Sequence, residues 1–214
     1  MTVASALWSF ALLAGLLTII PGLDTALVLR SSLTQSRSHA YATAFGICSG
    51  SFVWGAAAAV GAAALLAASE LAFTILKLAG AAYMVYLGVT MLVASFRRRD
   101  EEVSLPVVKP ARSYLASFGK GALTNLLNPK VGVFYIALIP QFIPEGVFPL
   151  GMGLLLALVH VLESLVWFSA IILATQFARK WLTSPKVVRW IDRVTGGILI
   201  GFAALLALES RPAV

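Results

Sequence analysis

The sequence predicts an all-α membrane protein with six transmembrane helices, arranged as two inverted three-helix repeats. Its composition, its long apolar stretches and the polar breaks within two of them carry this prediction. Of the 214 residues, 60% are hydrophobic and 12% are charged, and the mean hydropathy is +0.93. Soluble domains average about 45 to 50% apolar and about 25% charged residues. The composition therefore excludes an ordinary soluble domain and indicates a polytopic membrane protein.

Apolar stretches of transmembrane length occur along the whole chain. A hydrocarbon core of about 30 Å requires roughly 20 apolar residues in a helix that rises about 1.5 Å per residue. The stretches of this length are Val3 to Leu29, Tyr41 to Ala68, Leu71 to Phe96, Tyr114 to Ile139, Phe148 to Phe177 and Trp190 to Leu208. The first has no positive residue before it and is too long for the apolar region of a signal peptide, so we expect a retained helix.

The basic residues indicate the orientation of these helices. The formal net charge is +7, but the basic residues lie at helix ends, which is typical of a membrane orientation signal and not of a nucleic-acid-binding surface. With the amino terminus outside, the three inner connections hold 13 of the 16 Lys and Arg residues: Arg30, Arg37, Arg97, Arg98, Arg99, Lys109, Arg112, Lys120, Arg179, Lys180, Lys186, Arg189 and Arg193. The outer loops hold Glu70 and Glu145 and no basic residue. The positive-inside rule therefore predicts both termini outside.

A single long connection, residues 97–113, divides one transmembrane domain into a repeat over residues 1–96 and a repeat over residues 114–214. Three helices per repeat is an odd number, so homologous halves would cross the membrane in opposite senses. Pro21 breaks the first helix, and Pro129 breaks the fourth. Counted at about 1.5 Å per residue from Arg30 and from Ile139, both breaks lie roughly 14 Å from opposite faces, near the midplane.

Polar groups at these breaks predict a site. In hydrocarbon an unpaired polar group costs several kcal/mol, so Asn128-Pro129-Lys130 is expected to be buried in protein or to line a wet cavity. Because proline has no N–H and crowds the carbonyl four residues earlier, Pro129 is expected to free the carbonyl of Asn125, and Pro21 that of Leu17. Transporters with discontinuous helices bind ions and substrates with such groups.

On this basis each polar residue at the breaks has an expected role in binding or proton transfer. Asp24 is expected to carry a proton or bind an ammonium group, because an ionised carboxylate is costly in a low dielectric. Asn125 and Asn128 would hydrogen-bond a zwitterion. Lys130 would pair with a carboxylate or balance the charge of Asp24. Pro21, Gly22 and Pro129 shape the breaks.

Three further polar residues lie in predicted spans. His160 and Glu163 share a helix face and are expected to form a buried, mutually satisfied pair, with a part in proton or substrate coupling as the alternative. A metal site is not predicted, since two ligands do not complete a shell, and no cofactor is expected. Lys77 either extends its ammonium to the outer interface or binds a substrate carboxylate.

Glycine pairs in the spans predict helix packing. Gly46 to Gly50 has the spacing of a nucleophile elbow, but it lies within a helix and has no assignable triad, so an enzyme is not predicted. This pair, like Gly197 and Gly201, is interpreted as a helix-packing surface.

The motifs resemble those of the lysine-exporter (LysE/RhtB) family of bacterial amino-acid exporters over nearly the whole chain. The matching segments are Pro21-Gly22-Leu23-Asp24-Thr25, Leu78 to Tyr83 with Tyr86-Leu87-Gly88, and Leu127-Asn128-Pro129-Lys130 continuing to Pro140-Gln141-Phe142. The family usually has proline where Leu23 stands, so the resemblance allows a softer first break here. It implies proton-driven export of amino acids or close derivatives, such as homoserine, threonine or homoserine lactone, across the bacterial inner membrane.

Two other classes of protein stay open at this stage. A passive channel would require a continuous polar stripe, which the sequence does not display. A structural or assembly membrane protein would leave Asp24 and Lys130 without a role. The expected partners are a small amino-acid substrate, the proton and the lipid bilayer, with no nucleic acid, and a homo-oligomer is left open.

Overall fold

The computed structural model describes residues 1–97, 111–175, 177, 181 and 184–208, and these residues form helices and no strands. The elements are α1 (Val3–Ile19), α2 (Leu23–Thr34), α3 (Arg37–Ala68), α4 (Glu70–Arg97), α5 (Tyr114–Leu126), α6 (Pro129–Leu138), the 3-10 helix η1 (Ile139–Phe142), α7 (Pro149–Leu173) and α9 (Pro185–Leu208). The all-helical prediction is confirmed.

Side-chain caps begin several of these helices. The Ser36 hydroxyl accepts a hydrogen bond from the His39 backbone N–H at the start of α3, and Ser113 accepts one from Ala116 at the start of α5. At the start of α6 the Asn128 side chain accepts from the Lys130 backbone. Such caps satisfy backbone donors that have no partner within the helix.

Both predicted helix breaks are present. The axes of α1 and α2 differ by 52° and those of α5 and α6 by 57°. The helices differ at several ends from the predicted apolar stretches: α2 continues to Thr34, beyond Leu29, and α7 ends at Leu173, before Phe177. The last helix begins at Pro185, ahead of Trp190, because proline is well tolerated in the first turn of a helix.

Some of the six predicted spans are helices long and apolar enough to cross a membrane. Among the described residues, α3 over Arg37–Leu65 and α7 are each long and apolar enough to span a membrane, and counting each bent pair as one span raises the number to four. The spans expected at Leu71 to Phe96 and at Trp190 to Leu208 lie within α4 and α9. Their crossing of the membrane stays a prediction.

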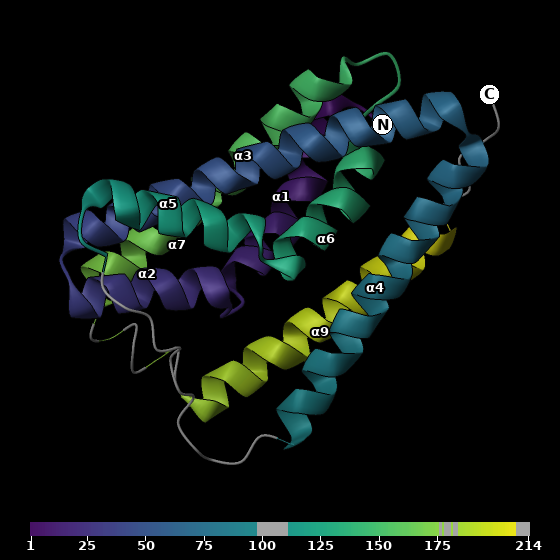
Figure 1. Ribbon diagram of the computed structural model, residues 1–214. Coiled ribbons are helices and arrows are strands. Elements are labelled where there is room, and N and C mark those ends of the chain that lie inside the picture. Colours follow the sequence, from purple (N-terminus) through teal and green to yellow (C-terminus); the bar gives the residue numbers. More distant parts are fainter. Residues whose placement is uncertain (98–110, 176, 178–180, 182–183, 209–214) are drawn as a thin grey trace.

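The helices form two groups joined through the broken helices. Figure 1 shows α4 and α9 packed along each other, while α2, α3, α5 and α7 form a second group. The broken helices contribute α1 and α6 between these groups, and a large apolar core includes Phe10, Phe134 and Tyr135. At the breaks the polar Asn125 and Asn128 are buried, whereas Leu23 and Leu127 are exposed.

Glycines allow α3 and α5 to approach within backbone contact. A Cβ atom on Gly46 would overlap the Phe118 carbonyl, and one on Gly121 would overlap the Thr43 carbonyl. Gly50 faces the side chain of Asn125. The predicted packing role of Gly46 and Gly50 is therefore confirmed. Small residues at helix interfaces in membranes serve this close approach.

The predicted packing role of Gly197 and Gly201 was wrong. A Cβ atom on either would meet no atom of the described residues within 4 Å. The contact is made by the neighbouring Gly196, whose added Cβ would lie 2.7 Å from the Gly88 carbonyl oxygen.

Two glycine contacts are reciprocal. A Cβ on Gly88 would lie 2.7 Å from the Gly196 oxygen, the same distance as in the opposite direction. Between α3 and α7, a Cβ on Gly55 would lie 3.0 Å from the Gly153 oxygen, and one on Gly153 would lie 2.8 Å from the Gly55 oxygen. These glycines therefore bring α4 close to α9 and α3 close to α7.

Gly121→Ala and Gly119→Ala form a matched test of the backbone contact, because both lie in α5 but a Cβ on Gly119 meets nothing within 4 Å. Gly121→Ala is expected to destabilise the protein by about 1 to 3 kcal/mol through overpacking. Gly119→Ala is expected to be neutral or to stabilise it by up to about 1 kcal/mol. Thermal unfolding in detergent measures both changes, and equal melting temperatures would contradict the close contact.

Candidate functional site

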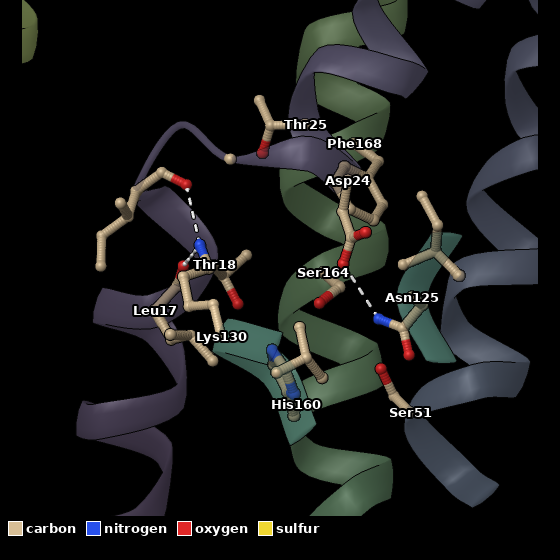
Figure 2. A pocket seen from close by; sticks show the side chains of 14 residues that line it. Leu17, Thr18, Asp24, Thr25, Ser51, Asn125, Lys130, His160, Ser164 and Phe168 are labelled. Atoms are coloured by element: carbon tan, nitrogen blue, oxygen red, sulfur yellow. Dashed lines mark hydrogen bonds between the residues drawn. The ribbon is translucent and has the colours of Figure 1, made fainter. Parts of the chain in front are cut away.

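A small polar cavity of about 30 Å³ lies where the two broken helices meet (Figure 2). Its lining comes from α1, α2, α3, α5, α6 and α7. The polar residues of this lining are Thr18, Asp24, Thr25, Ser51, Asn125, Lys130, His160 and Ser164. One water requires roughly 10 to 15 Å³ by this kind of measure, so the cavity has room for about two waters.

Asp24 and Asn125 join the two halves of the chain. The Asn125 Nδ2 donates a hydrogen bond of 2.9 Å to the Asp24 Oδ2 (Figure 2). Asp24 lies in the first turn of α2, where the helix dipole favours a carboxylate. The Asn125 side chain fits beside α3 because Gly50 has no Cβ; one built there would lie 2.6 Å from the Asn125 Oδ1.

Two oxygens of this pair lack a partner. The Asp24 Oδ1 and the Asn125 Oδ1 are both buried, and neither has a hydrogen-bond partner among the residues that the structure describes. Buried polar atoms are nearly always hydrogen-bonded, and an unpaired one is costly. The two atoms therefore form an acceptor site with unused capacity.

Lys130 reaches from the second half of the chain to the end of α1. Its Nζ lies 3.5 Å from the carbonyl oxygens of Leu17 and Ile20, at the outer limit of a hydrogen bond (Figure 2). The negative end of the α1 dipole favours a cation there. Gly22 leaves room for the ammonium, since a Cβ at this position would lie 2.9 Å from Nζ. Lys130 and Asp24 line the same cavity, but Lys130 donates to carbonyls and not to the carboxylate.

One of the two freed carbonyls is placed as expected. The Leu17 carbonyl, which Pro21 cannot reach as a donor, is the one that Lys130 approaches. The expectation for the Asn125 carbonyl was wrong. It accepts hydrogen bonds from the Asn128 backbone N–H at 3.1 Å and from the Trp54 Nε1 at 3.4 Å.

The second break is a helix start and not a kink in a continuous helix. Pro129 is the first residue of α6, a position where its missing N–H would have no helical partner in any case. The buried Asn128 caps this helix by accepting a hydrogen bond of 3.2 Å from the Lys130 backbone, and its side chain does not line the cavity. This cap helps to fix the start of α6, which carries Lys130.

The predicted pair of His160 and Glu163 was wrong. His160 Nδ1 is hydrogen-bonded instead to the Tyr135 hydroxyl at 2.8 Å, and the imidazole lines the cavity. Glu163 faces α1, where its Oε1 would lie 3.6 Å from a Cβ built on Gly15. Its Oε2 is buried without a partner. The turn of α7 places the two side chains in different surroundings.

Of the predicted site residues, the cavity lining includes Asp24, Asn125, Lys130 and Gly22. Pro21 lines a larger neighbouring cavity. The side chain of Lys77 lies outside the described part of the chain, although its backbone belongs to α4. Sequence reasoning missed Ser51 and Ser164. A signal for Ser164 existed, because it follows His160 by four residues and so lies on the same helix face.

The two breaks are built alike but carry opposite charges. Gly22 and Asn128 are the N-caps of α2 and α6, and Asp24 and Lys130 each stand two residues further on. Each charged side chain extends to the end of the opposite half's first helix segment, Asp24 to α5 and Lys130 to α1. This arrangement offers acceptors to a cation and an ammonium to an anion within one cavity.

Comparison of the sequence with known proteins identifies its family. The LysE type translocator family matches residues 13–210. An uncharacterized membrane protein, YrhP, of Bacillus subtilis is 31% identical over 201 residues, which cover 92% of this chain and 96% of that protein. A threonine efflux protein of Salmonella typhi is 28% identical over 189 residues, 88% of this chain and 91% of that protein.

A third relative has a similar level of sequence identity. An uncharacterized membrane protein of Vibrio cholerae is 30% identical over 200 residues, covering 93% of this chain and 95% of that protein. No solved structure matches the chain. The family match extends over both broken helices and nearly all of the sequence, and the chain therefore belongs to the LysE type translocator family.

Proposed function

We propose that this protein is a secondary active exporter that moves amino acids or close derivatives out of the cytoplasm in exchange for protons. The observation that carries the proposal is the pair of opposite charges, Asp24 and Lys130, at equivalent positions of two broken helices around one cavity. The family match and the threonine efflux proteins among the relatives support an amino acid as the substrate.

The site has the chemistry to bind a zwitterion. A substrate ammonium carries three donors, and the unpartnered Asp24 Oδ1 and Asn125 Oδ1 are acceptors for two of them. A substrate carboxylate would draw the Lys130 ammonium away from the carbonyls of Leu17 and Ile20, since charge-assisted hydrogen bonds are the stronger ones. The substrate then replaces contacts that otherwise hold the two halves together.

Competition at Asp24 supplies the coupling. The carboxylate can hold a substrate ammonium or a proton, but the protonated form no longer attracts a cation. A proton that arrives from outside therefore displaces the substrate outward, and loss of the proton to the cytoplasm restores the binding form. This exchange at one group is antiport.

Inverted repeats would supply the movement. The reciprocal contacts of Gly55 with Gly153 and of Gly88 with Gly196 join helices that occupy corresponding places in the two halves. They support a two-fold relation between residues 1–96 and 114–214. Rocking of such repeats about a midplane site exposes it alternately to the two sides.

A passive channel is less well supported by this geometry. The polar cavity has a volume of about 30 Å³, which holds roughly two waters, and it is bordered by apolar residues such as Leu17, Val131 and Phe168. A structural or assembly role would leave the buried unpaired oxygens of Asp24 and Asn125 without an explanation. The proposed location is the bacterial inner membrane with both termini outside.

Thiol labelling tests the orientation. Single cysteines at Ser104, Gly146 and Ala213, in a background where Cys48 is replaced, are treated in intact cells with a membrane-impermeant reagent. We expect labelling at positions 146 and 213 and protection at position 104, because the basic connections should be cytoplasmic. Labelling at position 104 alone would invert the topology.

Asp24→Asn tests the coupling group, with Glu163→Gln as the matched control at another carboxylate that has a buried oxygen. Asp24→Asn is expected to abolish substrate accumulation driven by an imposed proton gradient, since the amide cannot carry the proton, while the protein still folds. Glu163→Gln should retain accumulation. Uptake into inverted vesicles measures both, and the opposite pattern would assign the coupling to Glu163.

Lys130→Gln tests the carboxylate contact, with Lys186→Gln at the exposed start of α9 as the control. Glutamine keeps a donor for the α1 carbonyls but removes the charge, so substrate affinity should fall about tenfold or more with a small change in melting temperature. Pro129→Ala should alter stability little, because Pro129 begins a helix. Unchanged affinity in Lys130→Gln would remove Lys130 from the site.

A further inference from the structure

A second cavity of about 220 Å³ adjoins the polar one, lined from α1, α4, α6 and α9. The two cavities share Leu17, Ile20 and Lys130. We propose that this second cavity receives the side chain of the substrate and selects amino acids with a sizeable uncharged, apolar or thioether side chain. The inference rests on the proposed function and specifies its substrate class.

Size separates the roles of the two cavities. The polar cavity of about 30 Å³ can hold the charged groups of an amino acid only by displacing water, and it has no room for a side chain beyond them. A cavity of about 150 Å³ with an apolar lining suffices to bind benzene. The second cavity is larger than this, so a side chain of the size of leucine, methionine or phenylalanine fits.

The chemistry of the lining favours an uncharged side chain. The wall includes Met84 and Met91 of α4, Val133 and Phe134 of α6 and Leu199 of α9, together with Tyr83. Methionine adapts its shape to apolar and sulfur-containing groups. Binding sites for small molecules are typically apolar with a few polar groups that orient the ligand. A charged side chain placed here would lose most of its hydration against the apolar part of the wall.

The charged residues of this cavity fit an amino acid with a neutral side chain. Lys130 stands where the cavities meet, which places a substrate carboxylate there and directs the side chain away from Asp24. The same ammonium repels lysine and arginine side chains. Asp192 also lines the wall, but it has an interaction of its own within the protein.

Substrate competition tests the assignment in inverted membrane vesicles that take up labelled threonine. Unlabelled leucine and methionine are expected to inhibit uptake at about tenfold lower concentration than alanine, because each buried methylene adds to binding. Lysine should inhibit poorly. If lysine competes best and Asp192→Asn removes that preference, the inference is overturned.

Variants of the cavity wall decide whether this space causes the preference. Val133→Trp should reduce the advantage of leucine over alanine at least fivefold, whereas Ile136→Trp, at a residue of the same helix that is 37% exposed, should leave it unchanged. Leu199→Phe fills the cavity from α9 more mildly and should act in the same direction if Val133→Trp folds poorly. Val133→Ala should improve competition by phenylalanine.

The outcomes distinguish this inference from the function on which it rests. Threonine uptake without preference for larger apolar side chains, or a preference that Val133→Trp and Leu199→Phe leave unchanged, would overturn the inference and leave the exporter proposal standing. Absence of uptake for every amino acid tested in the wild-type protein would overturn the proposed function and this inference together.

Discussion

The interaction of each broken helix with the opposite half of the chain is the constraint on which the structure depends. Asp24 binds Asn125 at the end of α5, and Lys130 approaches the carbonyls at the end of α1. A charge buried in a membrane protein is tolerated when helix dipoles and polar partners compensate it. The breaks supply those partners, because a helix that ends inside the protein exposes carbonyls or N–H groups. Charge and break therefore require each other.

Close helix approach makes this exchange geometrically feasible. Gly46 and Gly121 bring α3 and α5 into backbone contact, and Gly50 leaves space for Asn125. Gly22 does the same for the Lys130 ammonium. Larger residues at these positions would move the polar groups apart or require the backbone to shift. These glycines therefore allow the polar side chains to reach their positions, in addition to allowing the helices to pack closely.

In the proposed exporter the two cavities would bind different parts of the substrate. The polar cavity holds the groups that recognise charge, while the larger apolar cavity lies on the other side of Lys130. All amino acids carry the ammonium and carboxylate that the polar cavity would recognise. The shape of the apolar cavity, in contrast, is set by residues of α4, α6 and α9. Affinity and selectivity would accordingly depend on different helices, and the proton coupling at Asp24 would be separable from the choice of substrate.

The sequence alone determined the all-helical class, the two helix breaks and the membership in a translocator family. Composition indicates whether the surrounding solvent is water or lipid, and a proline within an apolar run shows where a backbone N–H is missing. Both can be read from the sequence without knowing which residues meet in the fold. Asp24, Asn125 and Lys130 were also expected to meet at one site, because polar residues in hydrocarbon are rare and costly, and all three line the polar cavity. Their partners were a different matter. The sequence paired His160 with Glu163, but the structure pairs it with Tyr135. The helix-end carbonyls that Lys130 approaches were not predicted as its partners. Partner choice depends on how helices rotate about their axes and cross one another, which residues far apart in the chain decide together, and only the tertiary structure contains that information.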